Sequence, residues 1–128
     1  MKNLKKSTLL AMGVFVMFSA FTFIDLSSKL IRWESKTHDF GTIEKDEPVN
    51  QTFYFVNDSE SSISIIKTKT SCGCTVSEHS QGEILSGQRG FVKAEYNAAK
   101  SGVFSKTVSV YTSLGDKPIL LKIKGEVR

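Results

Sequence analysis

The stretch VFSKTVSVYT, residues 103–112, decides the fold, because apolar and polar residues alternate along it. Phe104, Val108 and Val110 share one parity, and Lys106 falls on the same parity. Successive side chains of a β-strand point to opposite faces, so this alternation predicts a strand with one buried face and one exposed face.

Six further stretches have the same character, and turn-forming residues separate them. They are residues 38–43, 49–57, 63–68, 74–78, 91–97 and 119–127. The short connections leave no room for crossover helices, which favours antiparallel pairing. The sequence therefore predicts an all-β fold, an immunoglobulin-like antiparallel β-sandwich of about seven strands.

Several residues have an expected place in this sandwich. Trp33 precedes the first predicted strand and should plug one end, and Gly41 permits a bulge or bend. Residues 57–59 fit the glycosylation acceptor pattern, but we interpret them as an Asx turn. The expected core residues are Phe40, Phe53, Phe55, Ile65, Val92, Phe104, Val108 and Ile123.

The N-terminus has the pattern of a targeting segment. Lys2, Lys5 and Lys6 precede residues 8–24, which carry no charge. The length of this apolar run lies between that of a cleaved signal and that of a membrane-spanning helix, so both remain open. We expect a hydrophobic targeting helix in residues 1–28, a folded domain in residues 29–128, and membrane contact through residues 8–24 if the segment is not cleaved. The basic head predicts export, to the periplasm or the outer face of the cytoplasmic membrane.

The charge of the folded part excludes one class of function. The chain carries 17 basic and 13 acidic residues, and residues 29–128 carry 14 and 12 of them. The basic residues are scattered along the sequence rather than clustered. We therefore expect no nucleic-acid partner.

The only two cysteines, Cys72 and Cys74, flank Gly73 and form the one constellation with distinctive chemistry. In an exported protein they suggest a disulfide, although cysteines two residues apart in a strand sit about 6.6 Å apart at Cα and the chain must kink at Gly73. Such a bridge would be strained and easily reduced. We expect the pair to be partly exposed, at the end of the third predicted strand.

Two other interpretations of this pair remain open. Two thiols on one face suit copper or zinc, with His79 as a third ligand and His38 reaching across the sheet, but a closed zinc site needs four ligands. Alternatively, both cysteines are small packing residues beneath a loop. Because the two histidines lie in or beside strands and Asp39 should face away from His38, we expect no catalytic site and no bound cofactor.

The chain resembles the bacterial DUF1573 family. The resemblance covers residues 37–125 and rests on the order and spacing of short motifs, above all SCGCT at residues 71–75. The other matching pieces are HDFGTI (38–43), FYFVN (53–57), Gly87-Gln88, Tyr96-Asn97, Phe104 with Lys106, and Ile123-Lys124-Gly125. The resemblance implies an immunoglobulin-type domain related to ciliary and sperm-protein sandwiches, and it implies no function.

Two functions are consistent with these observations. The first is a non-catalytic binding or structural module of the cell envelope, whose exposed edge strands or end loops contact another protein. The second is a thiol-redox or copper-handling accessory protein that uses Cys72 and Cys74.

Overall fold

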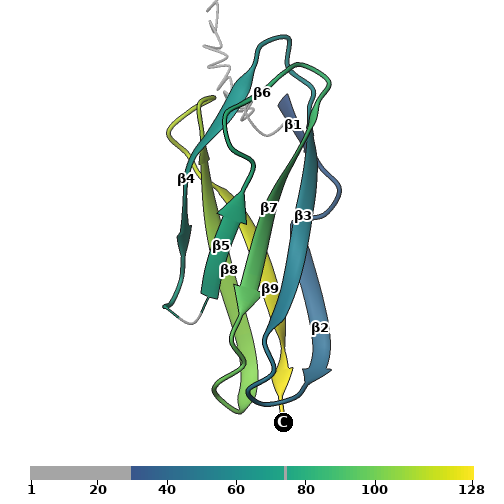
Figure 1. Cartoon of the computed structure of the whole chain (residues 1–128), viewed down its shortest axis with the longest axis vertical. Helices are drawn as coiled ribbons and strands as arrows, with labels where there is room; N and C mark the ends of the chain where they lie inside the picture. The colour runs from purple at the N-terminus through teal and green to yellow at the C-terminus, as the bar shows by residue number, and fades with distance from the viewer. Residues whose placement is uncertain (1–29, 74) are drawn as a thin grey trace, which may run out of the picture.

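Two β-sheets face each other in the computed structural model, which describes residues 30–73 and 75–128 (Figure 1). The four-stranded sheet has the order β1-β3-β7-β5, and the five-stranded sheet has the order β2-β9-β8-β4-β6. The strands are β1 (Ile31–Trp33), β2 (Thr37–Ile43), β3 (Val49–Asn57), β4 (Ile63–Thr70), β5 (Thr75–His79), β6 (Glu83–Ile84), β7 (Arg89–Tyr96), β8 (Gly102–Thr112) and β9 (Ile119–Val127). The predicted all-β sandwich is confirmed.

The described residues form nine strands, so the prediction of about seven was too low. The two missed strands, β1 and β6, contain three and two residues. Segments of that length are too short to show alternation, which is the signal that identified the other strands.

One strand pair corrects the prediction that all pairing is antiparallel. β2 runs parallel to β9, with His38 opposite Ile123. A parallel pair needs a long connection between its strands. Because β2 and β9 stand at opposite ends of the domain sequence, the rest of the domain serves as that connection, whereas the prediction considered only successive strands.

The predicted bend at Gly41 is confirmed. The register of β2 against β9 shifts between Asp39 and Thr42, and Gly41 has a φ of 66°. The Gly41 N–H donates a hydrogen bond of 2.8 Å to Oδ1 of Asp39. A left-handed φ is strained for residues that have a Cβ, so glycine allows the bulge at this position.

The core lies between the two sheets. Every predicted core residue is buried except Phe40, which is half-buried because β2 is an edge strand. The prediction that Trp33 precedes the first strand was wrong. Trp33 ends β1, pairs with Phe55 of β3, and packs its ring 4.7 Å from the ring of Phe55.

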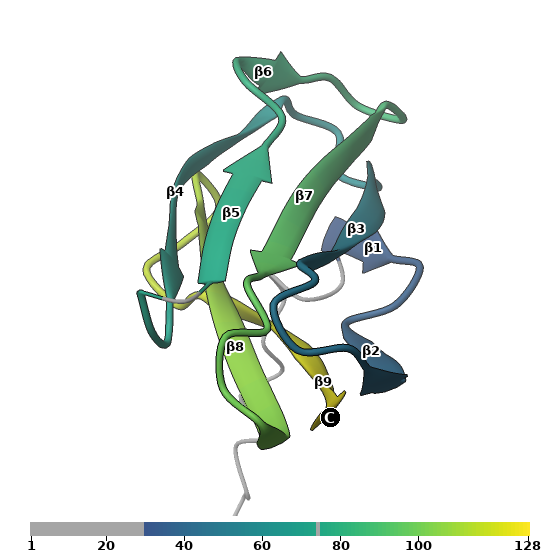
Figure 2. The same ribbon diagram turned by 60° about the horizontal axis from the view of Figure 1, so that its bottom comes forward.

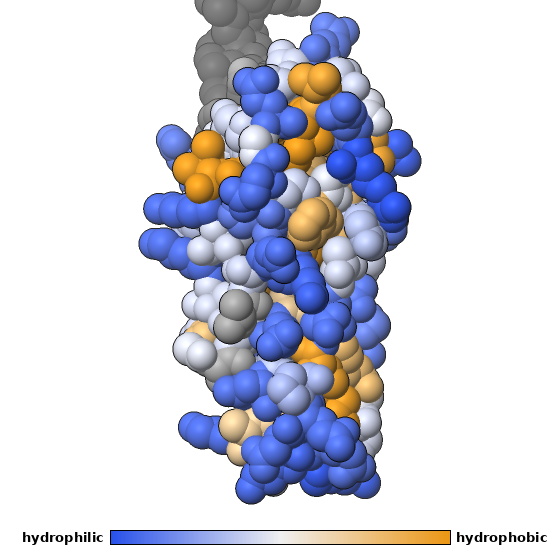
Figure 3. Space-filling model, in the orientation of Figure 1, coloured by the Kyte–Doolittle hydropathy of each residue, from blue (hydrophilic) through white to orange (hydrophobic). Residues whose placement is uncertain are grey.

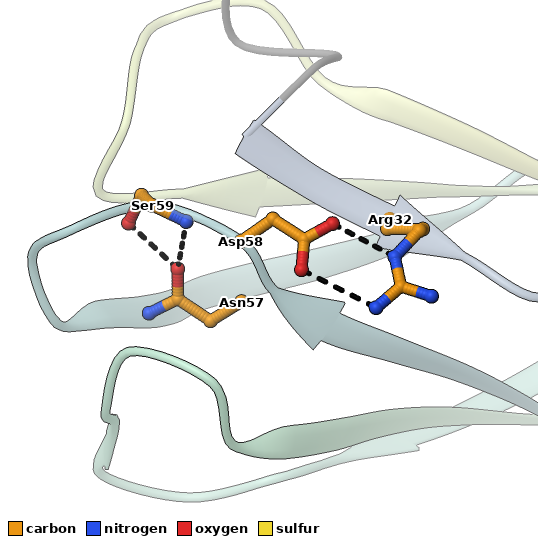
Figure 4. Close-up of polar contacts among 4 residues, drawn as sticks. All are labelled: Arg32, Asn57, Asp58 and Ser59. Atoms are coloured by element: carbon orange, nitrogen blue, oxygen red, sulfur yellow. Dashed lines mark hydrogen bonds and ion pairs between the residues drawn. The ribbon is translucent and has the colours of Figure 1, made fainter.

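The predicted Asx turn after β3 is confirmed, and it closes the upper end of the sandwich (Figure 4). Oδ1 of the fully buried Asn57 accepts hydrogen bonds from the N–H and the hydroxyl of Ser59, at 2.9 and 2.6 Å. Its Nδ2 donates to the carbonyls of Ser61 and Ile84, at 2.8 and 2.9 Å. Asn57 therefore ties the turn to β6.

The predicted targeting segment lies in residues 1–28, outside the described residues. Within residues 30–73 and 75–128, no helix has the length and apolar character needed to span a membrane.

Candidate functional site

The chain passes from one sheet to the other between β4 and β5, and the predicted cysteine site lies at this corner. β4 belongs to the five-stranded sheet and β5 to the four-stranded sheet, and the two strands run side by side at one side of the sandwich (Figure 2). A hydrogen bond of 2.5 Å between the hydroxyls of Thr68 and Ser77 joins them. The Ser71 N–H then donates to the Thr107 carbonyl of β8 at 3.0 Å, which holds the start of the corner against the sheet.

Cys72 is half-buried and disulfide-bonded. Its backbone carbonyl accepts a hydrogen bond of 3.0 Å from Oγ1 of Thr70, and its Sγ lies 3.6 Å from Oγ1 of Thr75. Cys74 is the only other cysteine in the sequence, and it lies outside the described residues. The partial exposure predicted for Cys72 agrees with the structure, whereas the redox behaviour of the pair stays a prediction.

Neither histidine lies near Cys72. His79 ends β5, four residues and about 13 Å along the strand from Thr75, and its Nδ1 lies 2.8 Å from the Ser80 carbonyl. His38 lies on β2, three strand spacings or about 14 Å from β4. The described residues contain no group of three His, Cys, Asp or Glu that could hold a metal ion. The copper or zinc site with Cys72, Cys74 and His79 stays a prediction, and neither histidine is placed to be a third ligand beside Cys72.

A pocket of about 330 Å³ opens beside Cys72, at the lower end of the sandwich. Its lining consists of Cys72, Gly73, Tyr96, Asn97, Ala99, Lys100 and Lys106. The ladder between β4 and β8 ends with Thr70 opposite Val108, so its continuation places Cys72 beside Lys106. Sequence reasoning missed this pocket. The available signal was a lysine at a core-facing position of residues 103–112.

Two features shape the pocket. The ring of Tyr96 is almost completely buried and stacks on Phe104 with 4.2 Å between ring centroids, so one wall is rigid and aromatic. The Asn97 side chain accepts a hydrogen bond of 3.2 Å from the Ala99 N–H, which orders the loop that carries Lys100.

A second hollow, of about 350 Å³, lies on the outer face of the five-stranded sheet above Gly41 and Gly125. Its lining carries Asp39 and Glu126 as well as Lys124, and Lys124 lies 4.0 Å from Asp39. The mixed charges give this hollow no preference for a ligand of either sign.

The lower part of β4 has an open edge. Ser71 donates to β8, and alternate residues of an antiparallel strand direct their N–H and C=O groups to opposite sides. The backbone N–H and C=O groups of Lys67 and Lys69 therefore point toward β8, whereas those of Thr68 and Thr70 point away from it. In the described part of the chain, β6 is the strand that covers this edge, and it pairs only with Ile63 and Ser64.

Among the strands that the structure describes, none pairs with the edge of β5 on the same side. The Ser80 N–H donates to the Phe91 carbonyl of β7, so the backbone groups of Ser77 and His79 point away from β7. Two open edges, one from each sheet, thus flank the corner at Cys72.

Cations near the β4 edge lack acidic partners. The Nζ atoms of Lys67 and Lys69 lie 5.0 and 5.9 Å from the ring centroid of Tyr111, and within the described residues neither lysine forms an ion pair. Arginines of the four-stranded sheet are paired instead: Arg32 with Asp58 at 2.8 Å and Arg89 with Glu34 at 2.6 Å. The hydrogen bond from Arg32 lowers the pKa of Asp58.

Two facing sheets with these connections define an immunoglobulin-like or PapD-like β-sandwich. The chain belongs to the DUF1573 family, described as "Protein of unknown function (DUF1573)", whose family model matches residues 31–127. The resemblance seen in the sequence is thereby confirmed. No curated protein matches the chain.

Solved structures of similar fold share little sequence with the chain. A protein of unknown function from Porphyromonas gingivalis W83 has 14% identity and a TM-score of 0.65, and the match covers 76% of this chain and 46% of that one. The ASH/PapD-like domain 7 of human CEP192 has 11% identity and a TM-score of 0.61, with 77% and 85% covered. The VesB protease of Vibrio cholerae has 11% identity and a TM-score of 0.62, with 78% and 32% covered. This chain thus spans less than half of the Porphyromonas protein, and these likenesses show the fold alone.

Proposed function

We propose that the protein is a non-catalytic binding module of the bacterial cell envelope, which accepts an extended segment of a partner protein as an added strand on β4. The observation that carries this proposal is the open lower edge of β4. Strand addition uses main-chain hydrogen bonds at an exposed sheet edge for affinity, and side-chain contacts for specificity.

The backbone of β4 offers the required groups. The N–H and C=O groups of Thr68 and Thr70 point away from β8, and β6 ends its pairing at Ser64. A partner segment would therefore lie below β6, along residues 66–70. There its backbone would satisfy the free groups of both threonines.

The side chains near this edge favour an acidic segment. Lys67 and Lys69 lie on the outer face of the sheet, where they would neighbour alternate side chains of an added strand. Ile66 is 62% exposed and adds an apolar contact; Figure 3 shows apolar side chains over the upper part of β4, surrounded by polar ones. Lysines on an edge strand also disfavour pairing with a second copy of the same edge, because like charges would meet.

Three observations support the non-catalytic role and the location in the envelope. His79 lies on β5, which runs beside β4, whereas His38 lies on β2 at the opposite edge of the five-stranded sheet, so the two histidines are too far apart to share one acid–base site. The disulfide bond at Cys72 suits an oxidising compartment such as the periplasm. The basic and apolar N-terminal sequence points to the same location.

Photo-crosslinking in intact envelopes tests the proposal. A photoreactive residue replaces Ile66 at the open edge, and in a control it replaces Leu120, which is similarly exposed on β9. We expect crosslinks to a protein partner from position 66 and not from position 120. Thr68→Pro should abolish them, because proline has no N–H, whereas Thr68→Val should preserve them.

The folding of the proline variant needs a separate measurement, since a fixed φ also strains a strand. The variant Lys67→Glu/Lys69→Glu tests the same interface without touching the backbone and should also lose the crosslinks. Equal crosslinking from positions 66 and 120, or crosslinks that survive both Thr68→Pro and the charge reversal, would refute binding at this edge.

A thiol-redox role is the second candidate, favoured by the half-buried disulfide-bonded Cys72 next to Lys106. A reduced Cys72–Cys74 pair would pass two electrons and two protons to a disulfide of a partner and become a disulfide itself. A nearby ammonium lowers the pKa of a thiol and promotes such exchange. A reduction potential near −200 mV, measured in glutathione buffers, would support this role, whereas a value below about −300 mV would mark a structural bridge.

A further inference from the structure

Lys106 occupies a position that alternation assigns to the core. It lies between Phe104 and Val108 on the inward face of β8, and both of these neighbours are buried. A charged side chain that points between two sheets is costly unless it is paired or reaches water. Lys106 is half-buried and, in the described part of the chain, forms no ion pair.

The ammonium of Lys106 instead reaches the pocket at the lower end of the sandwich. Its Nζ lies 5.9 Å from the ring centroid of Tyr96, within the range of a cation–π contact. Lys100 supplies a second cation to the same pocket, and none of the described residues that line it is acidic. The pocket is therefore positively charged and open to a ligand that carries the opposite charge.

The rest of the lining is suited to an apolar body. Tyr96 and Ala99 provide apolar surface, and Cys72 and Gly73 form the opposite rim. The volume of about 330 Å³ lies at the lower end of the range for small-molecule sites. Among the described lining residues, Tyr96 and Asn97 carry the polar groups other than the two ammonium groups and the Cys72 sulfur, so the pocket has few donors for the many oxygens of a phosphate.

We propose that this pocket binds a carboxylate carried on a small aromatic or aliphatic group, with Lys106 and Lys100 holding the carboxylate and Tyr96 contacting the apolar body. The carboxylate could belong to a free organic acid or to a peptide. This site does not use the open edge of β4, so it stands or falls independently of the function proposed above.

Titration of the full chain, followed by backbone amide NMR shifts, tests the pocket with matched probes. 3-Phenylpropionate represents a free acid, and an acetylated tetrapeptide that ends in phenylalanine represents a peptide source. The neutral amide of each probe is its control. We expect both acids to shift the amides of Tyr96, Ala99 and Lys106, and each amide control to bind at least about tenfold more weakly. Whichever acid binds more tightly identifies the source.

Variants assign the binding to Lys106. Lys106→Met keeps the length of the side chain and removes the charge, so affinity for the acids should fall about tenfold. Lys106→Arg should retain binding, which separates loss of charge from a disturbed fold. Lys122→Met removes a lysine from the outer face of β9 and should change nothing.

Two results would overturn the proposal. In the first, neither acid binds more tightly than about 10 mM, which would mean that Lys106 serves only to keep this end of the sandwich hydrated. In the second, acids and amides bind equally well, or Lys122→Met weakens binding as much as Lys106→Met does.

Discussion

The two halves of β4 differ in whether a neighbouring strand pairs with their outer edge. In the upper half, Ile63 and Ser64 pair with β6, and Ile63 is almost completely buried. Asn57 holds β6 in place through its hydrogen bond to the Ile84 carbonyl. In the lower half, residues 67–70 pair only with β8 among the described strands, and their outer side lies open beside the corner at Cys72.

The change in sequence along β4 explains this difference. The strand begins with Ile-Ser-Ile-Ile and continues with Lys-Thr-Lys-Thr. Ile63 and Ile65 are buried in the core, and β6 and the Asn57 turn cover the edge beside Ile63, whereas Ile66 is exposed. The lysines tolerate an exposed edge and protect it from indiscriminate pairing. One strand thus combines an end whose edge β6 covers with an end whose edge no described strand covers.

The largest expected effect on stability comes from the lower end of the sandwich, where packed aromatic rings stabilise the fold. Phe104 stacks on Tyr96 and packs near Phe40. Phe104→Ala should lower the free energy of unfolding by about 3–5 kcal/mol, because it removes a buried aromatic ring and leaves a cavity. Urea denaturation measures the loss. The neighbouring Val103→Ala is the control, since Val103 is 85% exposed. Similar stability for both variants would show that the faces of β8 are assigned wrongly.

Asn57→Ala should destabilise the upper end by about 3 kcal/mol, since the Asn57 side chain no longer binds the carbonyl of Ile84 and the N–H of Ser59. Amide exchange should accelerate at Ile63 and in β6 before it does so elsewhere. Asn50→Ala, on the exposed face of β3, should change stability by less than about 0.5 kcal/mol. A loss spread evenly over the domain would contradict the view that Asn57 specifically closes this edge.

Replacing both Cys72 and Cys74 with serine should cost less than about 2 kcal/mol, because a bridge between them would close a very small loop. Thermal melting in oxidising and reducing buffer measures the effect. Melting close to that of the parent would leave the cysteines a role in function. Collapse of the fold would show that the lower end depends on the bridge for its structure.

The smallest effect concerns the hydroxyl pair that joins the two sheets at the corner. Thr68→Val and Ser77→Ala should each cost about 1 kcal/mol, and the double variant should cost little more than either alone. A double-mutant cycle by urea denaturation measures this coupling. Simple additivity would mean that the bond between Thr68 and Ser77 contributes nothing to holding the corner.

Alternation sufficed to predict most of the sandwich from the sequence. Phe53, Phe55 and Val92 are buried as expected, because alternation translates directly into faces of a strand. β1 and β6 were not predicted because strands of two or three residues are too short to show an alternation of apolar and polar residues. The parallel pairing of β2 with β9 was not predicted because no local signal reports which distant strand lies alongside.

The candidate site was only partly predictable. The position of Cys72 after a strand and its partial exposure follow from the polar residues around it. The metal site with His79 stays a prediction, and β5 carries His79 about 13 Å along the strand from Thr75. The pocket requires Tyr96 from one sheet and Lys106 from the other, so only the tertiary structure brings it together. The inward parity of Lys106 was nevertheless visible in the sequence.

Amide hydrogen exchange along the lower half of β4 tests the central claim, that this edge is open, most directly. In the free protein, the amides of Lys67 and Lys69 face β8 and should exchange slowly, whereas those of Thr68 and Thr70 should exchange at least about tenfold faster. This alternation would show an edge ready to accept a strand. Equal protection of all four amides would show that the edge is already paired, and it would contradict the proposed binding mode.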